Sequence, residues 1–458
     1  MTLTIGFGLV AGKNANAGIK AVARTIALER LIRNGRDGRT LPGLVESWAP
    51  SSDGLTWRIR LRPSARFHDG KVADADVVRR IIQTRLPDAL GPAFEDVADI
   101  RKVSDRELEI VLKKRSTFLM EQLGEFAIEE PGEEPGSALS GTGPFYVTSE
   151  HGNEIEMRAN ASYYGGKVAI DRIVIKPYKS VRSAWADMLR GKVDLLYDVG
   201  VDALDSLQSS SDVKVFAFQT RYLSLVVLNV QKPYLRDPAF RRQLNAAIDR
   251  DALVTDALRG HGTPAVTAVW PRHWAYTDDL PRFRFDPHPV SGPSPRHLEC
   301  VYSEPAYERL AIALQRQLRA IGVDLDLKQV TDEELLTRQA TGNFDAFLSD
   351  SLQGPNMLWP YLFWYTGAPY NHGRFSSTQV DTALDTIRHA ADDSTYKAGV
   401  AAFEGAVVND PPAIFLAWRE RARAVSSRFH VVGEPGSDVL FTLRDWRPVV
   451  DARVAGRN

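Results

Sequence analysis

Cysteine is nearly absent from this sequence. The single residue, Cys300, excludes an intrachain disulfide and any metal centre built from several thiolates. It lies in the apolar run 298–302, which predicts a buried strand residue rather than a reactive thiol. One cysteine does not decide in which compartment the protein works.

Long apolar runs and an excess of charge of one sign are also missing. No segment reaches the roughly 20 apolar residues that cross a bilayer. The 57 basic and 58 acidic residues give a formal net charge of −1, so the composition does not indicate a nucleic-acid partner. A chain of 458 residues is too long for one compact core and predicts two or three domains.

Hydrolase and metal-site signatures are missing too. The patterns G-x-S-x-G, H-E-x-x-H and the P-loop do not occur, and no histidines pair at metal-ligand spacing on a helix. The segment 6–11 fits the dinucleotide pattern G-x-G-x-x-G/A, but only a short strand precedes it and no helix opens directly from it. It is interpreted as a tight turn after a first strand, Leu3–Phe7. Because ligands bind at the carboxyl ends of α/β strands, Gly8 is a candidate ligand contact.

The segment 41–79 carries the most informative pattern. Asp53-Gly54 is a turn signal, and the residues that follow alternate between apolar and polar, which predicts a strand with one buried face. Asp74 can cap a helix whose apolar residues recur at helical spacing. In order, the segment reads Leu41-Pro42-Gly43-Leu44-Val45-Glu46-Ser47-Trp48, Asp53-Gly54-Leu55-Thr56-Trp57, Phe67-His68-Asp69-Gly70 and Asp74-Ala75-Asp76-Val77.

This order of motifs resembles the family 5 extracellular solute-binding proteins, receptors that feed peptides, nickel, opines and some sugars to ABC importers. The family pattern is L-A-E-S-W, D-G-L-T-[YW], L-R, F-H-D-G and A-D-V. Further segments match it later in the chain, namely Gly141-Thr142-Gly143-Pro144-Phe145, Asn160-Ala161-Ser162-Tyr163-Tyr164-Gly165-Gly166, Gly191-Lys192-Val193-Asp194 and Asp237–Arg250. Tyr164, Phe240 and Asn245 depart from the usual residues.

The resemblance implies an α/β, two-lobed periplasmic-binding-protein fold of the Venus-flytrap type II class, with an extra α+β subdomain inserted in lobe I. Lobe I is expected to comprise 1–228 and 418–458, with the inserted subdomain at about 41–147. Lobe II is expected to comprise 229–417. Two crossings, near Leu228-Asn229 and near Phe415–Trp418, are expected to form the hinge.

The resemblance also implies a function. The protein is expected to capture a small solute (peptide-like, opine, amine or sugar derivative) between its lobes and to deliver it to an ABC transporter permease in the inner membrane. We expect a periplasmic monomer with no enzymatic activity, cofactor, metal or nucleic-acid partner. Met1 is then an initiator added where a leader has been removed. A ligand-sensing domain of a regulatory system and an enzyme on the same fold are the alternatives.

Aromatic residues crowd one segment of the expected lobe II. A strand, Ala346–Leu348, is expected to run into a long loop whose aromatic content far exceeds the 9% average. Aromatic walls with a few polar groups suit a small-molecule pocket, although the same side chains can instead pack the core of the lobe. The candidate ligand residues are Trp359, Trp364, Tyr365, Tyr370, Asn371 and His372.

Asp350 is the most specific candidate. It matches the aspartate of the family segment W-x-x-D-[YW]-x-D-P, which in peptide receptors pairs with the α-amino group of the ligand. Gln353-Gly354-Pro355 replaces the usual D-P, which weakens the case for a peptide and leaves open an amino sugar, opine or amine. The alternative interpretation of Asp350 is a strand-end cap. Thr142 and Trp418 complete the candidate ligand residues.

Overall fold

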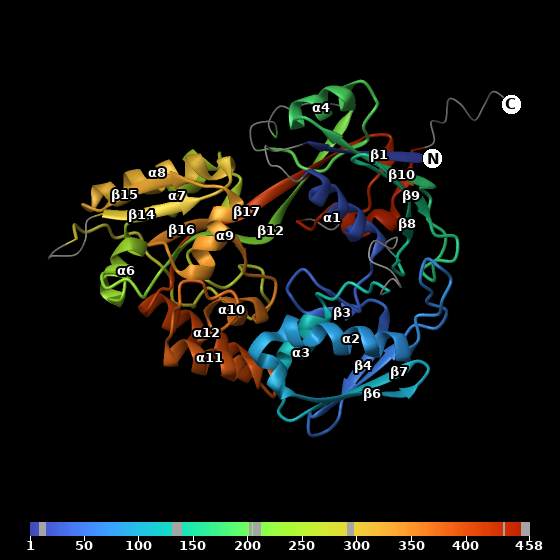
Figure 1. Cartoon of the computed structure of the whole chain (residues 1–458), viewed down its shortest axis with the longest axis horizontal. Helices are drawn as coiled ribbons and strands as arrows, with labels where there is room; N and C mark the ends of the chain where they lie inside the picture. The colour runs from blue at the N-terminus through green and yellow to red at the C-terminus, as the bar shows by residue number, and fades with distance from the viewer. Residues whose placement is uncertain are drawn as a thin grey trace.

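Two long antiparallel strands, β12 (Val213–Leu228) and β17 (Ala413–Ser426), run diagonally through the centre of the molecule (Figure 1). The computed structural model describes residues 1–8, 15–130, 140–200, 204, 212–290, 297–433 and 436–449. Both strands belong to an 11-stranded sheet with the order β15-β14-β16-β12-β17-β11-β1-β10-β9-β8, in which β13 also pairs with β17. The two strands therefore link the two ends of this sheet.

The strands on either side of this pair define two lobes. Lobe I is built on β1 (Thr2–Gly8), β8 (Phe145–His151), β9 (Glu154–Ala159), β10 (Arg172–Tyr178) and β11 (Leu195–Leu196), with α1 (Ala15–Ala27) and α4 (Val181–Leu189). Lobe II is built on β13 (Gly262–Pro264), β14 (His297–Tyr302), β15 (Asp324–Gln329) and β16 (Ala346–Leu352), with α6 (Pro238–Ala246), α7 (Arg250–Ala257), α8 (Glu308–Ala320) and α9 (Asp332–Thr341).

β12 changes neighbours part of the way along its length. Its first residues, up to Gln219, pair with β17, apart from one bridge between Phe218 and Gly436, whereas from Tyr222 onwards it also pairs with β16 of lobe II. The register against β17 shifts between Gln219 and Leu223. Strand pairing thus moves the chain from one lobe to the other within β12, several residues before the predicted crossing near Leu228.

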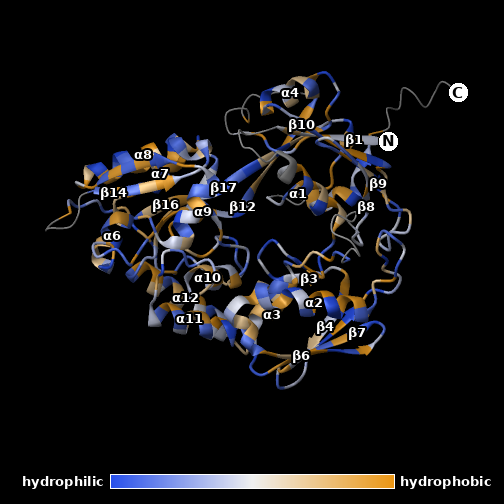
Figure 2. Ribbon diagram, in the orientation of Figure 1, coloured by the Kyte–Doolittle hydropathy of each residue, from blue (hydrophilic) through white to orange (hydrophobic). Residues whose placement is uncertain are grey.

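Capping residues fix the helices that cover the sheet. Ser180 and Ser183 form a capping box at the start of α4, and Asp249 accepts the Ala252 N–H at 2.9 Å at the start of α7. After α8 the chain passes through Gly322, whose φ of +85° suits glycine. The buried residues of α8 are apolar and pack against β15 and α7, whereas the rest of the helix is mostly hydrophilic (Figure 2).

The predicted subdomain is present as a separate antiparallel unit, which we call the insert. Asp74 caps its long helix, as expected, by accepting the N–H groups of Asp76 and Val77 at 2.9 and 3.0 Å. Its sheet has the order β4-β5-β7-β6. Its elements are β4 (Val45–Pro50), β5 (Thr56–Leu61), α2 (Ala75–Leu90), β6 (Val97–Ser104), β7 (Glu107–Leu112) and α3 (Thr117–Leu123), preceded by the hairpin β2 (Ile32–Asn34) and β3 (Thr40–Pro42).

Although the insert interrupts lobe I in the sequence, it packs on three helices of lobe II, α10 (Leu358–Trp364), α11 (Thr378–Arg388) and α12 (Asp393–Asn409). The Phe118 and Tyr361 rings lie 5.1 Å apart across this contact, and Glu121 accepts the Leu358 N–H at 3.0 Å. One continuous apolar core joins the insert to lobe II, whereas the main core of lobe I is formed by its own residues.

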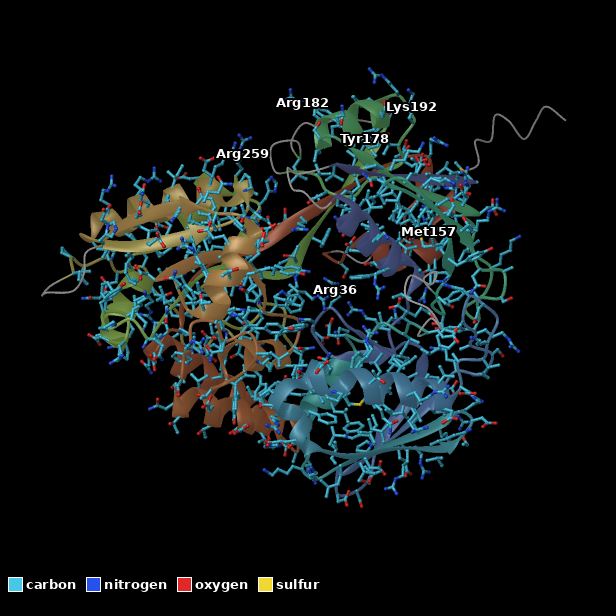
Figure 3. All side chains as sticks on the ribbon, viewed as in Figure 1. Arg36, Met157, Tyr178, Arg182, Lys192 and Arg259 are labelled. Atoms are coloured by element: carbon cyan, nitrogen blue, oxygen red, sulfur yellow. The ribbon has the colours of Figure 1, made fainter. Side chains whose placement is uncertain are left out.

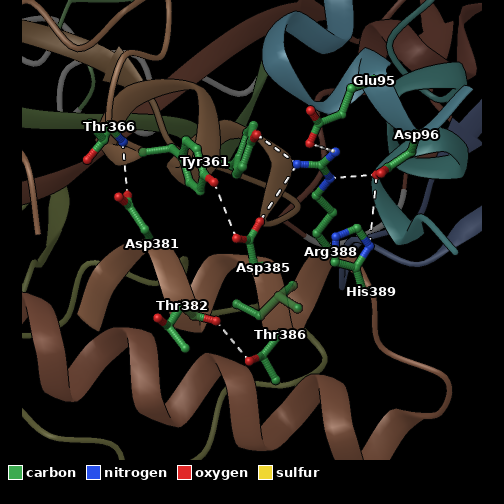
Figure 4. A network of polar contacts seen from close by, with 12 residues as sticks. Glu95, Asp96, Tyr361, Thr366, Asp381, Thr382, Asp385, Thr386, Arg388 and His389 are labelled. Atoms are coloured by element: carbon green, nitrogen blue, oxygen red, sulfur yellow. Dashed lines mark hydrogen bonds and ion pairs between the residues drawn. The ribbon is translucent and has the colours of Figure 1, made fainter. Parts of the chain in front are cut away.

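A buried ion pair crosses the same contact (Figure 4). Arg388 of α11 donates from Nε to Asp96 of the insert at 2.5 Å and from Nη2 to Glu95 at 2.9 Å. Its Nη1 donates to the hydroxyl of Tyr361 at 3.1 Å. The side chains of Arg388 and Asp96 are each only 1% exposed. Because both charges are shielded from water, each offsets the free-energy cost of burying the other.

Three predictions about local structure can be compared with these elements. Cys300 is fully buried in β14, and burial raises the pKa of its thiol to about 12, so the prediction of an inert strand residue is confirmed. The strand predicted to end at Leu348 continues to Leu352, and the predicted long loop contains the helix α10. Both expectations were therefore wrong, because β12 and the core of lobe II order residues that look irregular in the sequence.

Glu404, a fully buried carboxyl on α12, gives a pH-dependent prediction. It accepts the N–H of Ala268 at 3.0 Å and that of Val269 at 3.2 Å, yet burial raises its pKa from 4.5 to about 8. Between these values the folded state holds a proton that the unfolded state has lost, so stability should fall as pH rises, by at most about 1.4 kcal/mol per pH unit.

Urea unfolding at a series of pH values tests this expectation. The Glu404→Gln variant cannot titrate at this position, so its free energy of unfolding should change less between pH 4.5 and 8 than that of the wild type. Equal slopes for the two proteins would show that Glu404 does not hold the proton.

Candidate functional site

Asp350 lies inside β16 rather than at a strand end, which corrects the predicted placement. The Ser224 hydroxyl of β12 donates to its carboxylate, and its own backbone N–H donates to the hydroxyl of Tyr307 at 3.0 Å. Its Oδ2 lies 3.8 Å from Nε of Arg419 in β17. At that distance the two charges attract without forming a hydrogen bond. Asp350 is therefore a polar group of lobe II that lies beside the strands linking the lobes.

Three further charged residues surround Asp350, and we call the four together the hinge charge cluster: Glu304, Asp350, Arg419 and Arg421. Burial raises the pKa of Glu304, and the neighbouring charge of Asp350 raises it further. Neighbouring atoms partly desolvate the guanidinium of Arg421 although the residue is exposed, but Asp198 and Asp350 hold its pKa above the usual value. The cluster thus combines two acids and two bases where the chain passes between the lobes.

The two arginines of the cluster keep unused donors. Nη1 of Arg419 is buried and has no hydrogen-bond partner among the described residues. Arg421 is exposed, and its guanidinium makes no hydrogen bond or ion pair within the described part of the chain. Burial also raises the pKa of Tyr307, next to Asp350. These groups can accept a charged ligand without first breaking a strong internal pair.

The predicted aromatic candidates lie mostly in the packing of lobe II. Trp364 is buried and donates to Oε1 of Gln353 at 3.0 Å. Tyr365 donates to Oδ2 of Asp385 at 3.2 Å, which ties α10 to α11. Trp359 is half-buried against the same core. Tyr370, 44% exposed, lies on the Phe363 ring with 5.3 Å between centroids.

The polar candidates beside these aromatics have local partners. Asn371 donates to the carbonyls of Tyr365 and Phe375 at 3.1 and 2.7 Å, which holds a turn together. The ring centroids of His372 and Phe347 lie 6.3 Å apart in an edge-to-face arrangement. Burial lowers the pKa of His372, with Arg374 adding to the effect. Asp350 and the segment 359–372 thus occupy different environments.

The remaining candidates lie in lobe I and on the linking strands. Gly8 ends β1 and pairs with Tyr178, which lies beside α4 (Figure 3); a Cβ at Gly8 would come within 2.6 Å of Val181 Cα. Thr142 is buried and donates to Oε2 of Glu29 at 3.1 Å. Trp418 is buried in β17, opposite Leu223.

Sequence patterns did not point to Glu304, Tyr307, Arg419 or Arg421 as site residues. A signal for the arginines was present, because residues 419, 421 and 423 are alternate arginines after an apolar run. Alternation in a strand places all three on one face. Glu304 carried no comparable signal, since it reaches the cluster from the segment after β14, far away in sequence.

Two other features, a metal-binding cluster and a membrane span, are missing from the described ranges. Among those residues, no group of three or more histidine, cysteine, aspartate or glutamate side chains is arranged to hold a metal ion. None of the helices within the same ranges has the length and apolarity that spanning a membrane requires.

Several solved structures share the fold of this chain. Solved structures include AgaA of A. tumefaciens R10 in complex with agropinic acid (20% identity, TM-score 0.82, 98% of this chain and 99% of that one). Another is AppA of Bacillus subtilis with a nonapeptide (18% identity, TM-score 0.78, 98% and 99%). These likenesses confirm the predicted two-lobed α/β fold of periplasmic binding proteins, with its additional antiparallel subdomain.

Sequence relatives point the same way. The nickel-binding periplasmic protein of Escherichia coli K12 is 24% identical over 404 residues, covering 79% of this chain and 74% of that protein. The glutathione-binding protein GsiB of Pectobacterium atrosepticum is 25% identical over 474 residues, covering 90% and 86%. Residues 39–372 match the family described as bacterial extracellular solute-binding proteins, family 5 Middle. The chain therefore belongs to the family 5 bacterial extracellular solute-binding proteins, the non-catalytic receptors that bind a small solute for an ABC transporter.

Proposed function

We propose that this receptor works in the periplasm as a monomer, closes its lobes on one small solute, and passes the solute to a permease in the inner membrane. The observation that carries the proposal is the passage of β12 and β17 between the lobes, with a register shift at Gln219/Leu223. Paired linking strands are the usual hinge of such receptors. The nearly neutral net charge of the chain gives no indication of a nucleic-acid partner.

The lobe boundaries remain part of this proposal. Lobe I comprises about 1–228 and 418–458, and lobe II about 229–417, with the bending positions inside the strands at Gln219–Leu223 and near Trp418. The bend belongs there because β12 has a second neighbour, β16, only from Tyr222 onwards.

The hinge charge cluster is the proposed contact for the solute. Asp350 keeps a carboxylate that is 14% exposed and not bonded to Arg419, so it binds a cationic group once closure excludes water. Peptide-like, opine, amine and sugar-derivative solutes remain the classes considered. Relatives named for nickel, glutathione and agropinic acid are consistent with a small charged solute. Gly8, Trp359, Tyr370, His372 and Trp418 are secondary candidates, whereas the internal bonds of Trp364, Tyr365, Asn371 and Thr142 favour structural roles.

Closure should move the insert together with lobe II. The shared core, the Glu121–Leu358 bond and the Arg388–Asp96 ion pair bind those two units together. The insert meets lobe I through its connecting segments, in which Glu125 accepts from Arg221 of β12 at 2.7 Å. It also does so through Arg62, 5.8 Å from the Tyr164 ring, and through His68, whose Nδ1 accepts the Gly141 N–H at 3.1 Å. A connection of this kind can flex, whereas a packed core resists shear.

Distances between three labelled positions test closure. Exposed residues Arg190 (lobe I), Arg316 (lobe II) and Asp105 (insert) can be replaced in pairs by cysteine and spin-labelled, because Cys300 is buried. Adding the solute identified by native mass spectrometry of the freshly purified protein should shorten the 190–316 distance and leave the 105–316 distance unchanged. The radius of gyration should fall as well.

Two results would contradict the proposal. An unchanged 190–316 distance with bound solute would rule out hinge closure. A changed 105–316 distance would show instead that the insert moves independently of lobe II.

A further inference from the structure

Arg272 belongs to lobe II but reaches into lobe I. Its guanidinium is half-buried, and Nη1 donates to the carbonyl of Gly436 at 2.7 Å. The residues on either side of it are anchored in lobe II. Trp270 is buried in the core that lobe II shares with the insert, and His273 is buried and stacks on Tyr396 of α12. The backbone of Arg272 therefore moves with lobe II.

Gly436, in contrast, is fixed to lobe I. It forms a bridge with Phe218, which precedes the register shift in β12. Two residues later, Asp438 accepts from Nε and Nη2 of Arg423 in β17 at 3.2 and 2.7 Å. The short helix that follows, η3 (Val439–Asp445), packs its buried residues into the core of lobe I. The carbonyl of Gly436 therefore moves with lobe I.

The glycine lets the two lobes approach closely at this point. Gly436 has a φ of +75°, and a Cβ there would lie 2.4 Å from Nη1 and 2.6 Å from Nη2 of Arg272. Because glycine has no side chain and adopts this φ freely, the guanidinium can lie directly on the backbone of the other lobe.

The surroundings of Arg272 make this bond important to it. Burial and the neighbouring charge of Arg36, on the hairpin of the insert (Figure 3), lower the pKa of Arg272, whereas Glu420 of β17 acts in the opposite direction. Glu420 forms its ion pair with His261. Within the described residues, the bond to Gly436 is the one hydrogen bond that Arg272 donates. A partly desolvated charge beside a like charge needs an acceptor, so losing this one costs free energy.

We propose that the Arg272–Gly436 hydrogen bond is a latch between the lobes, which restrains them at the angle seen in this structure and breaks when they rotate far about the bend in β12 and β17. The inference rests on the proposed hinge closure and adds a device that sets its equilibrium. The bond lies beside the linking strands, so bending at Gln219–Leu223 changes the separation of its two ends. The long side chain can follow a small rotation, whereas a larger one carries the donor out of range.

One bond of this kind is enough to decide which lobe angle is populated. A hydrogen bond from a charged donor shifts a two-state equilibrium by about tenfold or more. The two conformations of such a protein differ by only a few times that amount, so a minor state can become well populated when the latch is removed.

Distances between spin labels at positions 190 and 316 test the latch in solute-free protein, from which any co-purifying solute has been removed by unfolding, dialysis and refolding. Arg272→Met keeps the length of the side chain and removes its donors. Gly436→Ala places a Cβ where the guanidinium lies, and the double variant combines the two changes. Arg282→Met is the matched control, because Arg282 is a half-buried arginine that donates to Asp278 of its own lobe.

Arg272→Met should lower the ratio of the population at the main wild-type distance to that at all other distances by about tenfold. Gly436→Ala should act in the same direction, and the double variant should add little, because both changes remove the same bond. Arg282→Met should leave the distribution unchanged. Equal distributions for the wild type and Arg272→Met would overturn the latch, as would additive effects of the two single variants.

The same labels separate this inference from the proposed function. If the co-purifying solute shortens the 190–316 distance in the wild type but Arg272→Met leaves the solute-free distribution unchanged, the latch is wrong and hinge closure stands. If the bound solute leaves the wild-type distance unchanged, the proposed function itself is wrong.

Discussion

Arg388→Met should destabilise the protein by about 3–5 kcal/mol, the usual consequence of removing one partner of a buried ion pair. The substitution leaves the Asp96 carboxylate, which is 1% exposed, without its guanidinium. It also removes the bonds to Glu95 and Tyr361. The loss should appear as a lower melting temperature, and limited proteolysis should cut the insert more readily, because Arg388 joins the insert to lobe II.

Two variants make this expectation specific. Arg316→Met removes an arginine that is 70% exposed and paired with Asp256 on the surface, so it should cost less than about 1 kcal/mol. Adding Asp96→Leu to Arg388→Met removes the orphaned charge and should restore part of the lost stability. If the double variant is less stable than Arg388→Met alone, the unpaired carboxylate is not the cause of the loss.

Local patterns predicted the elements whose residues carry their own signals. The alternation after Asp53-Gly54 gives β5 (Thr56–Leu61). The start of α2 at Asp74 follows from its cap. In these segments, short-range hydrogen bonds and one buried face decide the structure, and both are visible in a few consecutive residues.

Features made by distant residues were not predictable in this way. Arg388 and Asp96 are separated by 292 positions, and no local pattern pairs them. The segment 357–365 is apolar on all sides, as buried helices are, but its aromatics were expected in a long loop, where they could either line a pocket or pack the core. Ser349-Asp350-Ser351 interrupts an apolar run, yet β12 continues the strand through it by pairing each of these residues.

Asp350→Asn should weaken binding of the solute by about 2–5 kcal/mol, the typical cost of losing one partner of a buried charge pair. The amide keeps the shape of the carboxylate and removes its charge. In the unliganded protein this carboxylate is not fully solvated, because Asp350 already accepts from Ser224 and lies near Arg419.

The unliganded variant should therefore lose about 1 kcal/mol of stability, the scale of one hydrogen bond and one weak ion pair. Calorimetry with the co-purifying solute measures the first effect and urea unfolding of the unliganded protein the second, with the exposed Asp278→Asn as the matched control. Binding that is unchanged while stability falls would assign Asp350 to the structure of the hinge alone. Loss of binding with little loss of stability would place its charge on the solute, because a residue that only supports the strands affects the stability of the fold at least as much as binding.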